Sequence, residues 1–309
     1  MFFGTAEFAV PSLEQLAAHH HVAACVTQPE RPQGRGLERE PSPVKRAAQR
    51  LGVPLLQPER LHASLVEPLH SEVGVVAAYG NLIPRALLDL PIHGMVGVHP
   101  SLLPKYRGAA PVAWALLNGE TVTGVTIFRL SERLDAGEIM SQRRVAIELA
   151  EHADTLTRRL AQLGAEELVR TLEALATGRA IFTPQEEADA SFAPKLTKSQ
   201  GSIDWRKPAD AIERLVRAVI PWPGAIAQWR GEPLKVWRVS VSSAAAAPSV
   251  EPGTVVRVSA ETVSVATGQG TVNLEEVQPP GRRRMRISEF LAGHKISVGE
   301  SFGNSSSDY

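Results

Sequence analysis

A histidine stands at the end of an apolar, strand-like run in this chain. Residues 94–98 are apolar, His99 follows them, and a turn of proline and small residues comes next. Ligands of open α/β sheets bind in the crevice beyond the carboxyl ends of the strands, so this position suits a proton-transferring imidazole. A histidine that caps the strand and bonds its own loop would have the same sequence, and His99 alone leaves both interpretations open.

Asp135 is the second candidate for acid–base chemistry. It follows the strand-like run 123–130 and precedes Ala136 and Gly137, whose small size allows a tight turn. A loop of this kind can bring a side chain to the end of a neighbouring strand. A carboxylate close to His99 would orient the imidazole and favour its charged form. The spacing is equally compatible with a turn or capping role for Asp135.

The elements that must position these residues follow from the hydrophobic pattern. In residues 1–182, short apolar segments alternate with helix-like segments, which predicts a Rossmann-like α/β domain with a mostly parallel sheet. The expected strands are Met1–Phe3, Val22–Gln28, Val73–Ala78, Met95–His99 and Val122–Leu130. The expected helices are Pro11–Ala18, Ser42–Arg50, Pro84–Leu88, Ala110–Leu117 and Ala153–Thr177.

The pattern changes after residue 182. Residues 183–203 are polar and irregular, as in a linker. Residues 204–309 begin with a helix-like segment, 209–219, and continue with short strand-like segments separated by Gly/Pro turns, which predicts a small β-barrel. The expected strands of this part are 225–229, 234–242, 253–259, 262–266 and 271–277, with a loose loop over 243–248.

The composition excludes several broad classes of protein. The chain has 309 residues, of which 43% are hydrophobic, and this suits one large or two ordinary domains with full cores. No apolar run is long enough to span a bilayer, and the N-terminus does not have the pattern of a secretory leader. The single cysteine, Cys25, lies in an apolar run, which predicts a buried small residue. We therefore expect a cytoplasmic protein without membrane association.

The charges balance over the whole chain but not along it. Lysine plus arginine and aspartate plus glutamate each number 33, so the formal net charge is zero. Residues 1–194 carry 18 basic and 22 acidic side chains, whereas residues 195–309 carry 15 and 11. Zero net charge argues against a uniformly basic nucleic-acid-binding protein, while the later positive excess is compatible with a bound polyanion. Solvated charged faces produce differences of the same size.

The segments around His99 and Asp135, together with motifs elsewhere, resemble the methionyl-tRNA formyltransferase family. The signature is a strand, a histidine, Ser-Leu-Leu-Pro, an aromatic residue with Arg-Gly, and later Leu-Asp-x-Gly, here His99–Gly108 and Leu134–Gly137. The other motifs of the family occur in order along nearly the whole chain. They are Gly4–Leu13, Arg31–Gly36, Pro41–Lys45, Ala78–Gly80, Phe192–Leu196, Ile203–Trp205 and Pro221–Ala225.

The resemblance implies a reaction and its site. A formyl group would pass from 10-formyltetrahydrofolate to the α-amino group of methionyl-initiator tRNA, releasing tetrahydrofolate, with no metal and with His99 and Asp135 as the acid–base pair. The folate site would comprise Tyr79, Gly80, Ser101, Leu102, Leu103 and Pro104. The aminoacyl group would lie beside Gly4, Thr5 and Phe8, although Phe8 is equally compatible with ordinary core packing. The C-terminal barrel would be OB-like, and the chain would act as a monomer.

The sequence departs from the family at Gly97. Two residues before the histidine the family carries an asparagine, whose amide can donate to the formyl oxygen, and glycine has no side-chain donor. Loss of one such donor typically lowers the rate about 100- to 1,000-fold. Protonated His99, a backbone amide, an ordered water or another side chain could replace the amide, and we favour replacement because the rest of the signature is largely intact. The alternative is a folate- and tRNA-binding homologue with weak or lost catalysis.

The resemblance also indicates where tRNA would bind. Arg35, between Gly34 and Gly36, would be the key contact of a loop inserted into the acceptor stem, because such a loop can order against phosphates. The further candidate tRNA contacts are Arg31, Lys45, Lys195, Lys198, Lys207 and Arg283, and each could equally be surface charge. Formyltransferases of glycinamide ribonucleotide or of nucleotide-linked amino sugars share the catalytic domain. The basic second domain argues against the former, and the Gly34–Gly36 loop and the domain that carries residues 221–224 argue against the latter.

Overall fold

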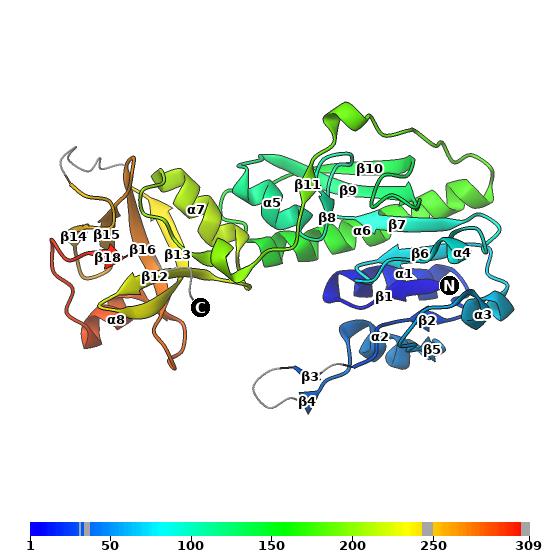
Figure 1. Ribbon diagram of the computed structural model, residues 1–309, viewed down its shortest axis with the longest axis horizontal. Coiled ribbons are helices and arrows are strands. Elements are labelled where there is room, and N and C mark those ends of the chain that lie inside the picture. The colour runs from blue at the N-terminus through cyan, green and yellow to red at the C-terminus, as the bar shows by residue number, and fades with distance from the viewer. Residues whose placement is uncertain (31, 34–37, 243–249, 304–309) are drawn as a thin grey trace. The chain divides into compact units, whose positions relative to one another are not determined.

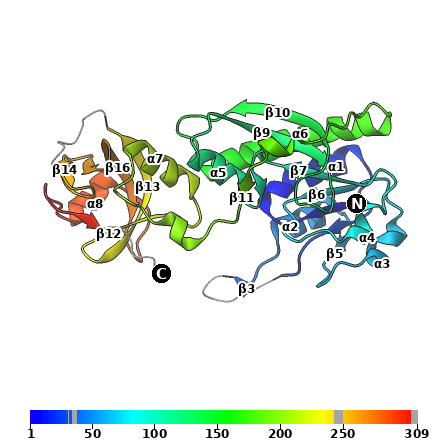
Figure 2. The same cartoon turned by 45° about the horizontal axis from the view of Figure 1, so that its top comes forward.

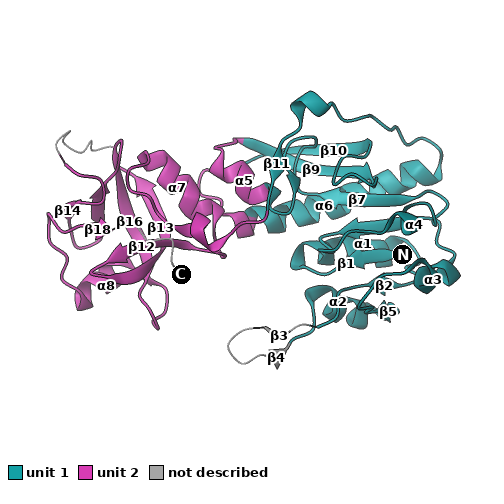
Figure 3. Ribbon diagram, in the orientation of Figure 1, with its two compact units in different colours: residues 1–111, 122–147, 156–194 teal, residues 112–121, 148–155, 195–309 magenta. Residues whose placement is uncertain are grey.

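The computed structural model describes residues 1–30, 32–33, 38–242 and 250–303. The chain forms two compact units, which Figure 3 shows in different colours. The first unit comprises residues 1–111, 122–147 and 156–194, and the second comprises residues 112–121, 148–155 and 195–309. The division after Pro194 lies inside the segment 183–203, and two short earlier stretches belong to the second unit. The loop expected over 243–248 lies outside the described residues.

The first unit is built on a seven-stranded sheet (Figure 1). Its spatial order is β10-β9-β7-β6-β1-β2-β5; the strands from β5 to β7 run parallel, and β9 and β10 are antiparallel. These strands are β1 (Phe2–Gly4), β2 (Cys25–Val26), β5 (Leu55–Leu56), β6 (Gly74–Ala77), β7 (Met95–His99), β9 (Val122–Arg129) and β10 (Ile139–Ala146). The chain moves outward from β1 to β5 and then returns to β6 on the other side of β1. This is the doubly wound order, and the predicted Rossmann-like sheet is confirmed.

Two strands of this sheet were not expected from the sequence. β5 has only two residues and therefore gives no periodic signal. β10 contains Gln142, Arg143 and Arg144, and its residues alternate between half-buried and exposed. It forms the edge of the sheet, where polar side chains protect the strand from pairing with other chains. Such a strand has no apolar run by which to recognise it.

The helices of the first unit begin and end where the sequence provides caps and close packing. α2 starts at Pro43 after Ser42, whose hydroxyl accepts from the Lys45 amide at 3.1 Å, and it ends at the left-handed Gly52. α6 lies along the sheet in Figures 1 and 2, and a Cβ at Gly164 would lie 2.9 Å from a Val98 methyl. The helices are α1 (Val10–His19), α2 (Pro43–Leu51), α3 (Ala63–Val66), α4 (Arg85–Leu88) and α6 (Ala153–Ala176), the last beginning in the second unit.

Cys25 confirms the interpretation of the single cysteine as a core residue. It lies in the central parallel part of the sheet and its side chain is buried. Burial raises the pKa of the Cys25 thiol to about 12, because the thiolate would lose its hydration there. Cys25 is therefore a structural residue and not a nucleophile.

The second unit is an antiparallel sheet with helices against it. Its spatial order is β14-β15-β16-β13-β12-β18, and β17 also pairs with β16. The strands are β12 (Ala225–Trp229), β13 (Glu232–Val241), β14 (Val255–Val258), β15 (Val263–Ala266), β16 (Thr271–Gln278), β17 (Met285–Arg286) and β18 (Phe302–Gly303). The helices are α5 (Pro111–Leu117), α7 (Ala209–Ala218) and α8 (Ile287–Gly293).

This second sheet curls until its two edges meet. The Val255 amide donates to the Glu300 carbonyl at 2.7 Å, and the Phe302 amide donates to the Gly253 carbonyl at 2.8 Å. Trp205 and Phe302 pack together inside, with ring centroids 5.9 Å apart. The expected small barrel is therefore a curled antiparallel sheet around an apolar core, and β17, β18 and α8 were not foreseen.

Two short pairs of strands complete the fold. β8 (Arg107–Gly108) runs parallel to β11 (Phe192–Ala193), and this pair ties the segment after β7 to the end of the first unit. β3 (Pro32–Gln33) is antiparallel to β4 (Glu38–Arg39). In the part of the chain that the structure describes, no helix has the length and apolarity needed to cross a membrane.

Candidate active site

The site lies at the switch point of the first sheet, where three parallel strands end level. Gly4 of β1 pairs with Ala77 of β6, and Ala77 pairs with Val98 of β7. The next residue of each strand therefore leaves the sheet at the same edge, so Thr5, Ala78 and His99 emerge together. Open α/β sheets bind their ligands at this edge.

His99 is almost fully enclosed, with 6% of its surface exposed. Its Nε2 lies 2.9 Å from the Tyr106 carbonyl oxygen, and its Nδ1 lies 3.7 Å from Asp135 Oδ2. A carbonyl can only accept, so Nε2 carries a hydrogen in this arrangement. Nδ1 is then the nitrogen that is free to gain or lose a proton. The ring also meets Phe128 edge-on, with centroids 6.4 Å apart.

Asp135 reaches His99 because its own loop is tightly turned. Its backbone has φ of 49°, a left-handed conformation that aspartate tolerates better than most residues. Its Oδ2 accepts from the Gly108 amide at 2.8 Å. A Cβ at Gly137 would lie 1.7 Å from the Arg129 carbonyl oxygen, so only glycine fits two residues after the aspartate. The predicted proximity of His99 and Asp135 is therefore present in the structure.

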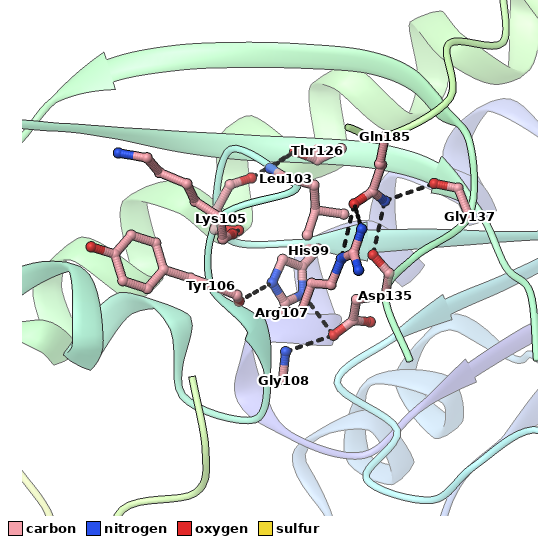
Figure 4. A network of polar contacts seen from close by, with 11 residues as sticks. His99, Leu103, Lys105, Tyr106, Arg107, Gly108, Thr126, Asp135, Gly137 and Gln185 are labelled. Atoms are coloured by element: carbon pink, nitrogen blue, oxygen red, sulfur yellow. Dashed lines mark hydrogen bonds and ion pairs between the residues drawn. The ribbon is translucent and has the colours of Figure 1, made fainter. Parts of the chain in front are cut away.

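A layer of polar contacts that sequence reasoning missed surrounds this pair (Figure 4). Arg107, whose side chain is 1% exposed, donates to Gln185 and Glu187. These hydrogen bonds, with those from Arg133, lower the pKa of the Glu187 carboxyl to about 2. Gln185 in turn donates to the carbonyls of Asp135 and Gly137. Arg107 was part of the recognised signature, but Gln185 and Glu187 lie in the polar segment that the sequence indicated only as linker.

The Ser101–Lys105 loop is fastened to the neighbouring strands. Ser101 is fully buried and its hydroxyl donates to the Lys105 carbonyl at 2.6 Å. The Leu103 amide donates to Thr126 Oγ1 at 3.1 Å, and Gln142 Nε2 donates to the Leu103 carbonyl at 2.8 Å. Among the expected folate residues here, Leu102 and Pro104 keep part of their surface exposed, whereas Ser101 and Leu103 are buried.

The residues expected around the pterin and aminoacyl groups form a second polar cluster at the same edge. The Tyr79 carbonyl accepts from Thr5 Oγ1 at 2.9 Å and from Gln28 Nε2 at 2.8 Å. The Tyr79 ring is buried edge-on against Phe3, and this burial raises the pKa of its phenol. The other three expected residues differ in burial: Gly4 and Phe8 are buried, and Gly80 is exposed.

Gly97 is enclosed by neighbouring side chains. It lies in β7 opposite Phe128, and a Cβ at Gly97 would lie 2.4 Å from Phe128 Cε1 and 2.8 Å from Leu130 Cδ1. A side chain at position 97 would thus occupy space that Phe128 and Leu130 already fill. The missing amide leaves no gap, and the site is packed for glycine.

The expected tRNA contacts differ in their surroundings. Arg31 and Arg35, with Gly34 and Gly36, lie outside the described residues. Two of the others form ion pairs, Lys45 with Glu30 and Arg283 with Glu289. The remaining three, Lys195, Lys198 and Lys207, have exposed side chains. Among the described residues, no cluster of three or more histidine, cysteine, aspartate or glutamate side chains could hold a metal ion.

Comparison with known families and proteins matches both units. A family model described as formyl transferase matches residues 1–172, and one described as formyl transferase, C-terminal domain, matches residues 195–295. The chain is 45% identical to a methionyl-tRNA formyltransferase of Roseiflexus sp. strain RS-1, over 99% of this chain and 95% of that protein. It is 41% identical to a protein of the same name from Geotalea uraniireducens strain Rf4, over 98% of this chain and 97% of that one.

Solved structures share the fold at low sequence identity. The structure of HypX from Aquifex aeolicus in complex with tetrahydrofolic acid aligns with a TM-score of 0.62 and 19% identity, over 99% of this chain and 50% of that one. An N-formyltransferase of Helicobacter canadensis, in complex with folinic acid and dTDP-3-aminofucose, aligns with a TM-score of 0.67 and 15% identity, over 88% and 97% of the two chains.

Proposed function

The chain belongs to the methionyl-tRNA formyltransferase family, and we propose that it transfers a formyl group from 10-formyltetrahydrofolate to the α-amino group of methionyl-initiator tRNA. The observation that carries the proposal is the 45% identity to a methionyl-tRNA formyltransferase over 99% of the chain. This similarity extends through the second unit, which the transfer chemistry itself does not require. We further propose that the protein acts in the cytoplasm as a monomer.

The reaction sets the requirements for a proton carrier. When the amine nitrogen attacks the formyl carbon, a C–N bond forms, the carbonyl oxygen becomes negative and the nitrogen must lose a proton. The bond from the formyl carbon to N10 of the folate then breaks, and N10 takes up a proton as tetrahydrofolate leaves. One group near the reacting carbon can serve both steps if it accepts the first proton and returns it in the second.

We assign this proton transfer to Nδ1 of His99. Nε2 is held by the Tyr106 carbonyl, whereas Nδ1 faces Asp135 Oδ2 at 3.7 Å. The carboxylate would stabilise the imidazolium that forms when the amine gives up its proton. Asp135 itself is held by the Gly108 amide, so the pair is oriented before substrate arrives.

The oxyanion needs a donor other than a side chain at position 97. Because Phe128 and Leu130 fill the space beside Gly97, an amide at that position has no room in this packing. The imidazolium of His99 is charged at the moment when the oxygen becomes negative, and it supplies electrostatic stabilisation in a site that is shielded from water. His99 would thus serve both as proton carrier and as oxyanion stabiliser.

Substrate binding follows the same division of the chain. For the folate we propose contacts from the partly exposed Leu102, Pro104 and Gly80, with Ser101, Leu103 and Tyr79 holding the surrounding backbone. The aminoacyl group would lie beside Gly4, Thr5 and Phe8, at the strand ends next to His99. The tRNA would contact the exposed Lys195, Lys198 and Lys207, together with Arg31, Arg35, Lys45 and Arg283.

A second candidate function follows from Gly97. A protein that binds folate and tRNA with weak or lost catalysis would also tolerate a site without the family asparagine. The filled space at position 97 favours this candidate, whereas the intact His99–Asp135 pair favours the enzyme.

Identification of the formylated product tests the proposal against the acceptors of related enzymes. The protein is incubated with 10-formyltetrahydrofolate and either methionyl-initiator tRNA or a nucleotide-linked amino sugar, and formylated product is quantified by mass spectrometry. The proposal requires formyl-methionyl-tRNA as the product. Formylation of the sugar alone would assign a different substrate class, and binding of tRNA without any product would favour the binding homologue.

A further inference from the structure

We propose that Gln185 is a positioning residue for formyl transfer, because its side-chain amide holds the loop of Asp135 against Arg107 and so fixes Asp135 beside His99. This inference rests on the proposed function and adds a residue to it. Gln185 lies in the segment after α6, 50 positions from Asp135 along the chain. The paired backbone bonds between Thr183 and Ile139, both 2.8 Å, bring this segment to the site.

The amide of Gln185 uses its full hydrogen-bonding capacity. Its Nε2 donates to the Asp135 carbonyl at 2.8 Å and to the Gly137 carbonyl at 2.7 Å. Its Oε1 accepts from Arg107 Nε at 3.0 Å and from Arg107 Nη2 at 2.8 Å. A primary amide has two N–H donors and two acceptor lone pairs, and here each has a partner. Figure 4 shows the side chain between the arginine and the two carbonyls.

These four hydrogen bonds connect the two segments that hold the catalytic pair. The Asp135 loop carries the carboxylate, and its backbone is in the left-handed region at Asp135. The Arg107 segment carries Gly108, whose amide donates to the same carboxylate. Asp135 is therefore held at its carboxylate by Gly108 and at its backbone carbonyl by Gln185. Release of the second contact would leave a strained loop to relax away from His99.

Glutamine suits this position better than residues of equal size. A glutamate would keep the bonds from Arg107 but would set a carboxylate against two carbonyl oxygens, with no N–H between them. A methionine would fill the volume and make neither set of bonds. Gln185 does not approach His99 in this network, so it acts through Asp135 and does not take part in the chemistry itself.

The test is the Gln185→Glu variant measured under steady-state conditions. We expect kcat for formyl transfer to fall about 10- to 100-fold, as for other displacements of catalytic groups by about 1 Å, with KM for both substrates within about 2-fold. Gln278→Glu is the matched control, because Gln278 also accepts from a side chain and donates to a backbone carbonyl, but in the second unit. It should retain the wild-type kcat.

A double-mutant cycle with Asp135→Ala separates positioning from a general loss of stability. If Gln185 acts through Asp135, Gln185→Glu lowers the single-turnover rate in the wild-type background and has no further effect in Asp135→Ala. Equal losses in both backgrounds, or an unchanged kcat in Gln185→Glu, would overturn the inference. Failure of the wild-type protein to form product would instead overturn the proposed function, so the two failures are distinguishable.

Discussion

Two arginines, Arg107 and Arg283, show how differently the two units use the same guanidinium group. The Arg107 side chain is 1% exposed and bonds Gln185 and Glu187 through three of its nitrogens. The Arg283 side chain is 72% exposed and pairs with Glu289 at 2.6 Å. A buried, fully bonded arginine fixes geometry, and its loss leaves buried groups unsatisfied. An exposed pair contributes about 0–1 kcal/mol and can exchange its partner for a phosphate.

The comparison predicts the largest effect for Arg107→Ala. Loss of the guanidinium removes the donors of Gln185 Oε1 and leaves a cavity beside the Asp135 loop. We expect the free energy of unfolding to fall by about 2–4 kcal/mol in denaturant titrations. A change below about 0.5 kcal/mol would show that the buried arginine has no more structural weight than the exposed one.

Gly97→Asn tests how tightly the buried region is packed. The new side chain would overlap Phe128 and Leu130, so we expect a loss of about 1–3 kcal/mol in unfolding free energy and no gain in turnover. The double variant Gly97→Asn/Phe128→Ala, which frees the space, is the control. A rise of turnover by orders of magnitude in the single variant would contradict a site built around glycine.

Glu187→Gln sharpens the comparison through pH. The pKa of the Glu187 carboxyl is lowered from 4.5 to about 2, first by hydrogen bonds from Arg107 and then by those from Arg133. A lowered folded-state pKa adds stability above about pH 4.5 that is lost as pH falls through about 2. The difference in unfolding midpoint between wild type and Glu187→Gln should therefore shrink from pH 5 to pH 2. A difference independent of pH would argue against this ion pair.

Arg283→Ala should have the smallest effect on stability and a measurable one on binding. We expect the free energy of unfolding to stay within about 0.5 kcal/mol of wild type. The slope of log K for tRNA against log salt should fall by about one if Arg283 contacts a phosphate. An unchanged slope would leave Arg283 as a surface charge.

The same pair of arginines marks how far the sequence predicts this molecule. The apolar run 95–99 and the alternation before residue 182 predicted the parallel sheet, and the His99 and Asp135 motifs predicted their meeting. These features follow from local pattern. The division of chain between the units does not, because it depends on which segments pack together, and the predicted domain boundaries remain a prediction.

The support of the site was beyond reach because it is non-local. Gln185 lies in a polar segment that has no periodicity, and its partners Arg107 and Asp135 are 78 and 50 residues away. Nothing in the spacing distinguishes a polar residue that spans a buried gap from one that faces solvent. The filled space beside Gly97 is similar, since it depends on Phe128 from an adjacent antiparallel strand.

The most direct test of the central claim is single-turnover formyl transfer to methionyl-initiator tRNA, with excess protein and 10-formyltetrahydrofolate, in wild type and His99→Ala. The account predicts transfer by the wild-type protein and a rate at least about 100-fold lower in His99→Ala, with tRNA affinity unchanged. Equal rates in the two proteins, or tRNA binding by the wild type without transfer, would contradict a site in which His99 carries the chemistry.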